Sequence, residues 1–127
     1  MPNCRENIKR QPPSELTMTK VLFLVVSGDE KMDLALTMAA NAVTKKLYED
    51  LKVIFFGPSE ERLLKLEGPA KDNFEKLLSG GAIDSSCVNY ANNKGIKDAI
   101  AKLNVKLMPA GDRLSYYLNN GYQVVTF

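Results

Sequence analysis

A continuous run of apolar residues near the start of the chain, Val21–Val26, most constrains the fold. Six apolar residues without polar alternation are typical of a β-strand buried on both faces, as in a parallel sheet covered by helices. Val53–Phe56 is a second such run, and weaker strand patterns occur at Ala82–Ser86, Val105–Met108 and Tyr122–Phe127. Helix-like segments separate these strands, and this alternation predicts a parallel sheet with helices on both faces.

The segment after the first strand carries a clear helix pattern. Ser27 and Glu30 have the spacing of a capping box, which favours a helix start there. Apolar residues then recur at helical intervals, so we expect them on the buried face of a helix of roughly 16 residues. They are Leu36, Ala40, Val43 and Leu47. Ser59 can cap a later helix, in which we expect Glu60–Arg62 to form a solvated face.

The composition excludes several classes of function. The chain has 127 residues, of which 45% are apolar and 25% are charged, as in a globular protein of one domain. It has no histidine, so it cannot form a histidine-based catalytic triad, general base or metal ligand. Two cysteines are too few for a thiolate zinc site, and we expect neither a metal nor a cofactor. A net charge of +2 does not favour nucleic acid as a partner.

Residues 1–19 differ in character from the rest of the chain. They are polar, contain Pro2, Pro12 and Pro13, and show neither helical nor strand periodicity. We therefore expect a mobile N-terminal tail, followed by one α/β domain over residues 20–127. The apolar run that follows the tail is too short for a signal peptide or a membrane span, so we expect a cytoplasmic protein with no membrane partner.

Ligands of parallel α/β sheets bind outside the carboxyl ends of the strands. In this chain, those ends are expected at Ser27–Asp29, Gly57–Ser59, Ser86–Cys87 and Met108–Ala110. Ser27–Asp29 occupies a position where phosphate-binding loops occur in other proteins. It lacks both glycine-rich patterns of nucleotide-binding loops, so we interpret it as a capped turn.

Cys87 is the main candidate for chemistry, because it lies where a strand gives way to a helix. The unpaired N–H groups and the positive dipole end of a helix start favour the thiolate, which is the reactive form. Ser85 and Ser86 precede the cysteine and Asn89 follows it, and these side chains can donate hydrogen bonds to a sulfur anion. The alternative interpretation is a small buried packing residue, a role that free cysteines often have.

The segment Gly81–Ile96 resembles the cysteine segment of the DsrE/DsrF-like family. The family pattern is an apolar strand, a cysteine, a short helix, and a basic residue followed by glycine; Lys94 and Gly95 stand at those last two positions. The opening strand with its long helix and the closing segment Gly121–Phe127 are also similar to the family. The resemblance covers residues 20–127. It implies a three-layer α/β/α domain with a five-stranded, mainly parallel, doubly wound sheet of the Rossmann or flavodoxin-like type.

In several members of that family, the cysteine corresponding to Cys87 accepts sulfane sulfur as a persulfide in an intracellular sulfur relay. The resemblance therefore implies a sulfur-carrier or sulfurtransferase subunit that forms homo- or hetero-oligomers, with donor and acceptor proteins as partners. For this chain we expect a homo-oligomer. This chemistry is thiol exchange, which needs no histidine, metal or organic cofactor. We expect Ser86 and Asn89 to hold the sulfur anion, and Gly28, Asp29 and Pro58 to border the pocket. Lys94 is expected to be a solvated charge near a helix C-terminus.

Two alternatives remain open at the level of sequence. In the first, the protein is a non-catalytic small-ligand-binding or assembly module of the same fold, with Cys87 as a packing residue. In the second, Cys87 is a redox-sensing thiol that Cys4 resolves as a disulfide. Tyr90, Tyr116 and Tyr117 are interpreted as core or interface residues, with pocket walls as the other reading.

Overall fold

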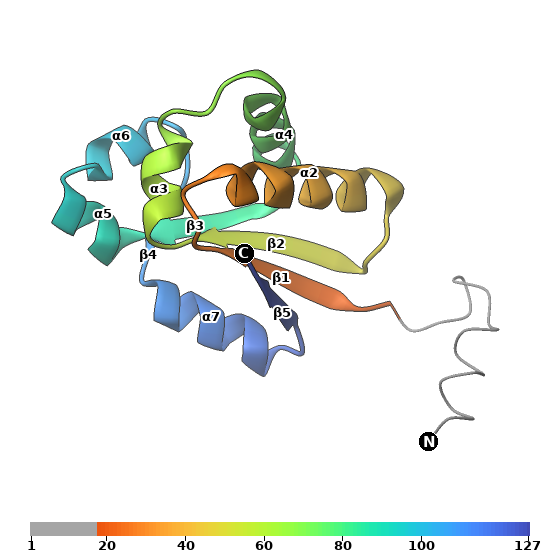
Figure 1. Ribbon diagram of the computed structural model, residues 1–127. Helices are drawn as coiled ribbons and strands as arrows, with labels where there is room; N and C mark the ends of the chain where they lie inside the picture. The colour runs from red at the N-terminus through yellow and green to blue at the C-terminus, as the bar shows by residue number, and fades with distance from the viewer. Residues whose placement is uncertain (1–17) are drawn as a thin grey trace.

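The computed structural model describes residues 18–127 and forms a five-stranded sheet with helices on both faces (Figure 1). The tail expected over residues 1–19, with Cys4, falls almost entirely outside the described residues. In chain order the elements are β1 (Lys20–Val25), α2 (Glu30–Lys45), β2 (Asp50–Phe55), α3 (Pro58–Leu63), α4 (Gly68–Ser79), β3 (Ile83–Cys87), α5 (Val88–Lys94), α6 (Lys97–Ala101), β4 (Leu107–Met108), α7 (Ala110–Asn119) and β5 (Gln123–Thr126).

The sheet has the strand order β4-β3-β2-β1-β5, and all neighbouring strands are parallel. The chain builds outward from β1 to one edge of the sheet and then returns to place β5 on the other side of β1. This doubly wound order confirms the predicted three-layer α/β/α fold. No helix within residues 18–127 is both long enough and apolar enough to span a membrane.

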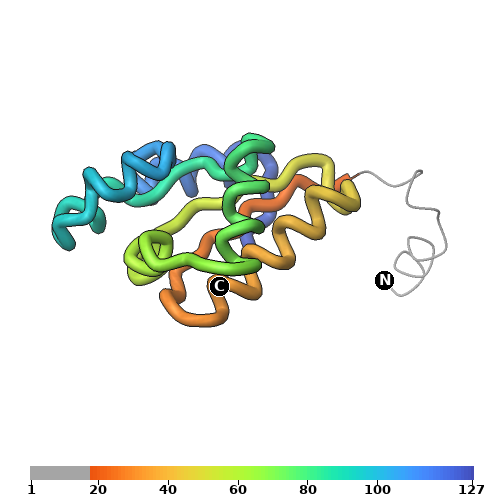
Figure 2. Tube along the Cα trace, turned by 90° about the horizontal axis from the view of Figure 1, so that it is seen from above, coloured from red at the N-terminus to blue at the C-terminus, as the bar shows by residue number. Residues whose placement is uncertain are grey.

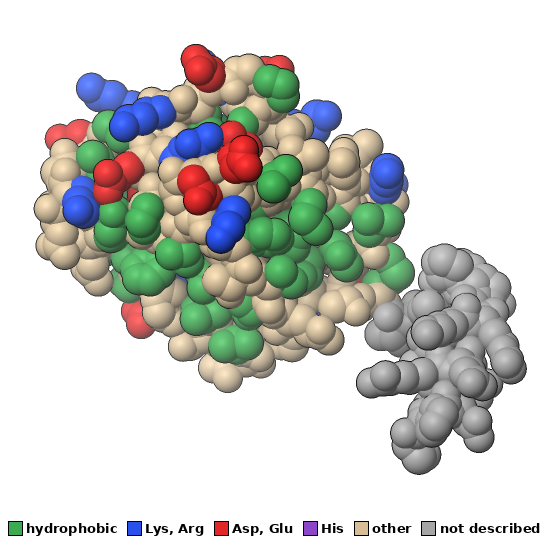
Figure 3. Space-filling model, in the orientation of Figure 1, with side chains coloured by type: hydrophobic (Ala, Val, Ile, Leu, Met, Phe, Trp, Pro, Cys, Tyr) green, Lys and Arg blue, Asp and Glu red, His purple; other side chains and the backbone are tan. Residues whose placement is uncertain are grey.

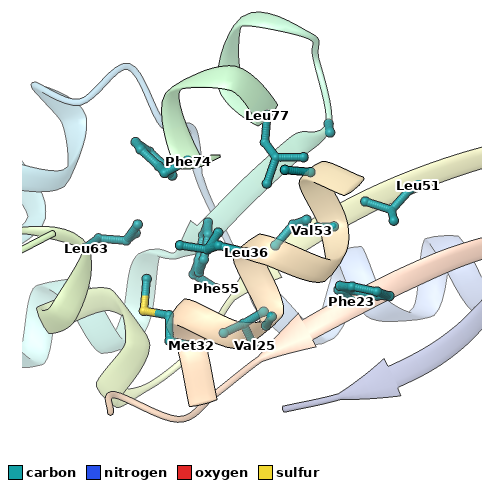
Figure 4. Close-up of a cluster of buried hydrophobic side chains, with 14 of the residues drawn as sticks. Phe23, Val25, Met32, Leu36, Leu51, Val53, Phe55, Leu63, Phe74 and Leu77 are labelled. Carbon is teal, nitrogen blue, oxygen red and sulfur yellow. The ribbon is translucent and has the colours of Figure 1, made fainter. Parts of the chain in front are cut away.

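The alternation of side chains along β1 divides the core into two layers. Val21, Phe23 and Val25 join a large cluster with residues of α2, α3 and α4, and Leu22 joins a smaller cluster on the α7 side. Figure 4 shows the large cluster, in which Leu36 and Phe55 lie near its centre. Both faces of β1 are thus buried, as its continuous apolar run predicts.

The helices α2 and α4 lie side by side over one face of the sheet, whereas α7 lies on the opposite face (Figure 1). In Figure 2, which is seen from above, α5 and α6 project at the end of the sheet opposite the start of β1. The carboxyl end of β3, at Cys87, continues directly into α5, which begins at Val88. This edge brings β1, β2, β3, α5 and α7 together at the candidate site.

The buried face of α2 differs from the predicted one. Leu36 and Ala40 are buried as expected, but Val43 and Leu47 are 40% and 53% exposed, so their assignment to the core was wrong. The helix ends at Lys45, before Leu47, and its buried residues are Met32, Ala35, Leu36, Ala39, Ala40 and Ala42. Its N-cap is Asp29, whose side chain accepts a hydrogen bond from the backbone N–H of Lys31, so the capping box predicted at Ser27 does not form.

Three other parts of the fold differ from expectation. Helix α3 begins at Pro58 with Gly57 as its N-cap residue, so Ser59 does not cap it, and the Ser59 hydroxyl instead donates a hydrogen bond to the Val25 carbonyl oxygen. The fourth strand is confined to Leu107–Met108 instead of Val105–Met108, and Asn104, just before the predicted strand, has a positive φ of 65°. Between β2 and β3 the register shifts after the pair Val53–Ile83, so that Ser85 lies opposite Ile54 and Asp84 is the extra residue of a β-bulge. This bulge re-aims the side chains at the end of β3.

Candidate functional site

A pocket of about 450 Å³ lies at the carboxyl edge of the sheet, next to Cys87. It is bounded by the end of β1, the segment after β2, the end of β3, α5 and the first turns of α7. Its lining residues are Leu24, Phe56, Cys87, Asn89, Tyr90, Asn93, Ala110, Gly111 and Leu114. The volume and the mainly apolar lining are typical of a site for a small molecule. Small molecules are the ligands that bind at this edge of parallel α/β sheets.

Cys87 is the last residue of β3 and the N-cap residue of α5. Its side chain packs in the smaller core cluster with Leu22, Ile54 and Ala110, and the residue is only 3% exposed. Cys87 nevertheless contributes to the pocket wall. The thiol thus has apolar neighbours behind it and a pocket in front of it, and only a group that enters the pocket can reach it.

Ser86 belongs to the opposite face of the sheet. Adjacent residues in a strand point to opposite faces, so Cys87 faces α7 whereas Ser86 faces α3. The Ser86 hydroxyl donates a hydrogen bond to Glu60 Oε1 at 2.5 Å, away from the pocket. The structure therefore differs from the expectation that Ser86 holds the sulfur anion. Of the two predicted anion-stabilising residues, only Asn89, in the first turn of α5, lines the pocket.

Glu60 is fully buried, so the prediction that it lies on a solvated helix face was wrong. Its Oε2 accepts a hydrogen bond from the backbone N–H of Gly57 at 3.0 Å, while its Oε1 accepts from Ser86. Burial raises the pKa of Glu60, and the hydrogen bond from Ser86 opposes this effect. Through Glu60, the start of α3 is connected to the end of β3, one residue before the cysteine.

The structure places Gly28, Asp29 and Pro58 at the carboxyl edge but not among the residues that line the pocket. Asp29 caps α2, and Pro58 begins α3, so both belong to the side of the sheet that α2 and α3 cover. Gly28 lies against Pro58 so closely that an added Cβ would come within 2.6 Å of the Pro58 carbonyl oxygen. These residues therefore lie at the same edge of the sheet as the pocket but do not form its wall.

Tyr90 forms part of the pocket wall and connects α5 to α3. Its hydroxyl donates a hydrogen bond to Glu61 Oε1 at 2.5 Å, and this bond raises the pKa of Tyr90 to about 12. The hydroxyl therefore stays protonated at neutral pH, and its proton is already donated to Glu61. Lys94, an exposed residue near the end of α5, places its ammonium 5.7 Å from the centroid of the Tyr90 ring.

A second polar cluster holds α7 against β3, and the sequence analysis missed it. The bulge residue Asp84 accepts two hydrogen bonds from the Arg113 guanidinium, at 3.0 and 2.8 Å, and one from the Tyr117 hydroxyl at 2.6 Å. Burial alone would raise the pKa of Asp84, but the bonds from Arg113, Tyr117 and Ser85 together lower it. Tyr117 is buried as expected, whereas Tyr116 is 50% exposed.

Most of the pocket wall was also missed. Leu24, Phe56, Asn93 and Leu114 line it, although none was singled out from the sequence. Phe56 carried a usable signal, because it ends the apolar run Val53–Phe56 where a strand is expected to reach the carboxyl edge. In the structure it follows β2 and is 41% exposed. Within residues 18–127, no group of three or more cysteine, aspartate or glutamate side chains is placed to hold a metal ion.

Comparison with known proteins supports the fold and gives no information on the chemistry of the site. No family model and no curated protein matches the chain. The structure is similar to that of a conserved protein of unknown function, BT1422, from Bacteroides thetaiotaomicron, with a TM-score of 0.70 and 19% sequence identity. The match covers 85% of this chain and 95% of that one. At this level of identity the similarity supports the fold alone, which is a three-layer α/β/α fold consistent with the Rossmann or flavodoxin-like type.

Proposed function

We propose that the protein is a sulfur carrier that accepts sulfane sulfur as a persulfide on Cys87 and passes it to a partner thiol. The observation that supports this most strongly is the position of Cys87 on the wall of a pocket of about 450 Å³ at the carboxyl edge of the sheet. The resemblance of Gly81–Ile96 to the DsrE/DsrF-like cysteine segment suggests the same chemistry.

The proposed reaction consists of two thiol exchanges. The Cys87 thiolate attacks the outer sulfur of a donor persulfide, an S–S bond forms on Cys87, and the donor leaves as a thiolate. An acceptor thiolate then attacks the outer sulfur on Cys87, which releases the Cys87 thiolate unchanged. Atoms and electrons balance over the two steps, so no separate oxidant or reductant is required.

The pocket offers support for the charged sulfur. Ala110 and Gly111, in the first turn of the ten-residue helix α7, form part of the wall. The positive end of the helix dipole therefore lies at the pocket and favours a negative charge there. Asn89 adds a side-chain amide that can donate a hydrogen bond. An S–S bond of about 2.05 Å moves the transferable sulfur away from the buried Cys87 position into the pocket.

The proposal is tested by incubating the folded protein with excess sulfane-sulfur donor and mapping adducts by mass spectrometry. A Cys4→Ser variant removes the second thiol, and a Cys87→Ser variant is the matched negative control. We expect one additional sulfur atom on Cys87 that a second thiol removes. Folded protein with no additional sulfur on Cys87 would contradict the relay.

A second candidate is a small-ligand-binding module in which Cys87 only packs. Its burial, at 3% exposure, and its place in the cluster with Leu22 and Ile54 favour this reading. The rate of alkylation of the native protein separates the two functions, because a relay cysteine reacts with a small reagent near neutral pH and a packing cysteine does not.

We also propose that the protein is cytoplasmic and assembles as a homo-oligomer. Hydrophobic side chains gather on the face of the molecule that Figure 3 shows. Leu34 and Met38, one turn apart on α2, are 59% and 54% exposed, and Val125 on the edge strand β5 is 41% exposed. Exposed apolar patches of this kind mark interaction surfaces. Light scattering on the purified full chain gives its mass, and a monomer at all concentrations would contradict the assembly.

A further inference from the structure

We propose that the pocket selects a small sulfur donor with an apolar, uncharged body, namely an organic hydropersulfide whose carbon group is a compact aliphatic or aromatic one. This inference rests on the proposed function, because it names the donor class for the same site. Its basis is the chemical character of the whole pocket wall and not the cysteine itself.

The electrostatic character of the pocket wall favours a donor with little charge. Among residues 18–127, those that line the pocket are apolar or neutral, and none carries a charged side chain. Lys94 lies over the outer Tyr90 ring but does not line the pocket, while the Glu61 carboxylate accepts the hydrogen bond of Tyr90. A donor whose only negative charge is on the reacting sulfur suits this wall. A donor with further charges would lose hydration there without gaining a counter-ion.

The pocket also offers apolar surface for the carbon group of the donor. Leu24, Phe56 and Leu114 come from three different elements and give the pocket apolar walls. Phe56 is 41% exposed and Leu114 is partly buried, so a bound carbon group would remove both from water. Apolar walls with a few polar groups are typical of sites that hold most of a small ligand's surface.

Access to Cys87 also favours a small donor. Cys87 is 3% exposed and is reached through a pocket of about 450 Å³. This volume lies toward the lower end of the range for small-molecule sites, which begins at about 300 Å³. A compact carbon group attached to two sulfur atoms fits such a space.

The test compares three donors on the Cys4→Ser protein: benzyl hydropersulfide, glutathione hydropersulfide and thiosulfate. The rate of sulfur addition to Cys87 is measured for each donor and divided by its rate with free N-acetylcysteine, which corrects for intrinsic reactivity. After this correction, we expect benzyl hydropersulfide to exceed the two multiply charged donors by about 10-fold or more, the scale of discrimination that a small apolar difference provides. Equal corrected rates, or faster transfer from thiosulfate, would overturn the inference.

Two variants change the wall in opposite ways. Leu114→Glu places a charge in the pocket and should reduce the corrected benzyl rate by about 10-fold or more. Leu118→Glu, at an exposed position one turn further along α7, is its matched control and should not change the rate. Asn93→Lys, at an exposed position of α5, adds a cation to the wall and should speed transfer from thiosulfate. If neither wall variant changes the donor preference, the pocket does not select the donor.

A binding measurement without sulfur keeps this inference separate from the relay. Benzyl alcohol is titrated into ¹⁵N-labelled Cys87→Ala protein, and we expect saturable amide shifts centred on Asn89, Asn93 and Gly111. Such shifts without any persulfide on native Cys87 would refute the relay and retain the ligand class. Persulfide on Cys87 without such shifts would retain the relay and refute the ligand class.

Discussion

The buried hydrogen bond between Ser86 and Glu60 predicts a large effect of replacing Ser86 by alanine. Within residues 18–127, the structure shows no second donor to Glu60 Oε1, so the Ser86→Ala change leaves this buried oxygen without a partner. Loss of a hydrogen bond to a buried charged group costs about 1.5–3 kcal/mol. We expect the free energy of unfolding at pH 7 to fall by about 2–3 kcal/mol, which lowers the urea midpoint by roughly 1 M.

Ser85→Ala is the matched control. Ser85 is the preceding residue, is also fully buried, and donates a hydrogen bond of 2.8 Å to Asp84 Oδ2. That oxygen still accepts a hydrogen bond from Arg113 Nε at 3.0 Å after the change, so no buried carboxylate oxygen loses its last donor. We expect a loss of about 1 kcal/mol or less. Both variants remove one buried hydroxyl oxygen from neighbouring positions. Ser86→Ala leaves Glu60 Oε1 without a donor, whereas Ser85→Ala leaves Asp84 Oδ2 with the donor Arg113 Nε.

The loss of stability caused by Ser86→Ala should depend on pH in one direction. Burial raises the pKa of Glu60 in the folded protein, and the Ser86 hydrogen bond lowers it, so the variant raises this pKa further. A raised folded-state pKa means stability that is present at low pH and is lost as the pH rises through that pKa. The destabilisation by Ser86→Ala should therefore grow from pH 4 to pH 8.

Urea unfolding monitored by far-UV circular dichroism across this pH range measures both variants, since the chain contains no tryptophan to serve as a fluorescent probe. Ser85→Ala should show no such growth, because the pKa of Asp84 is already lowered and this group stays ionised over most of the range. The reasoning would be refuted by equal losses for the two variants, or by a Ser86→Ala loss that shrinks as the pH rises.

Three further predictions concern the residues that shape the site. Gly28→Ala should cost about 2–3 kcal/mol in urea unfolding, because its Cβ would lie 2.6 Å from a backbone oxygen, whereas Gly111→Ala, with nothing near its added Cβ, should gain about 0.5–1 kcal/mol; the opposite order would contradict the contact. Arg113→Gln should lower the free energy of unfolding by about 2–3 kcal/mol at pH 7. Because the pKa of Asp84 is lowered in the folded protein, this loss should become smaller as the pH is lowered toward 3. A loss that does not depend on pH would exclude the ion pair as its cause. Glu60→Gln mimics the protonated side chain, so its stability relative to the native protein should rise from pH 4 to pH 8 in thermal unfolding, and a constant difference would mean that Glu60 does not titrate there.

The fold could be predicted because its main signals are local. The run Val21–Val26 has apolar side chains for both faces of a central strand, and its length of six residues suits a buried strand better than a buried helix. The ends of elements were less predictable. Val43 and Leu47 continue the apolar spacing of α2, but the helix stops at Lys45, and periodicity alone does not show where a neighbouring surface ends.

The site was predictable only in part, because strand parity and the bulge decide which side chains meet. Side chains alternate along a strand, so Ser86 and Cys87 lie on opposite faces of the sheet. The Ser86 hydroxyl is therefore next to the thiol in sequence but does not face the same pocket. The bulge at Asp84 has no sequence signal, and its partner Arg113 lies in α7, far along the chain. The burial of Glu60 was hidden for a similar reason, since an acid in the first turn of a helix is usually solvated.

The end of β3 shows how a thiol is held in place by residues that do not touch it. On the α7 side, Asp84 receives the Arg113 guanidinium and the Tyr117 hydroxyl. On the α3 side, Ser86 is bound to the buried Glu60. Each of these bonds anchors the strand from one face, and Cys87 is the next residue. Its direction into the pocket is therefore determined by polar contacts on both faces, while its immediate surroundings stay apolar and leave the space in front of the sulfur open to a ligand.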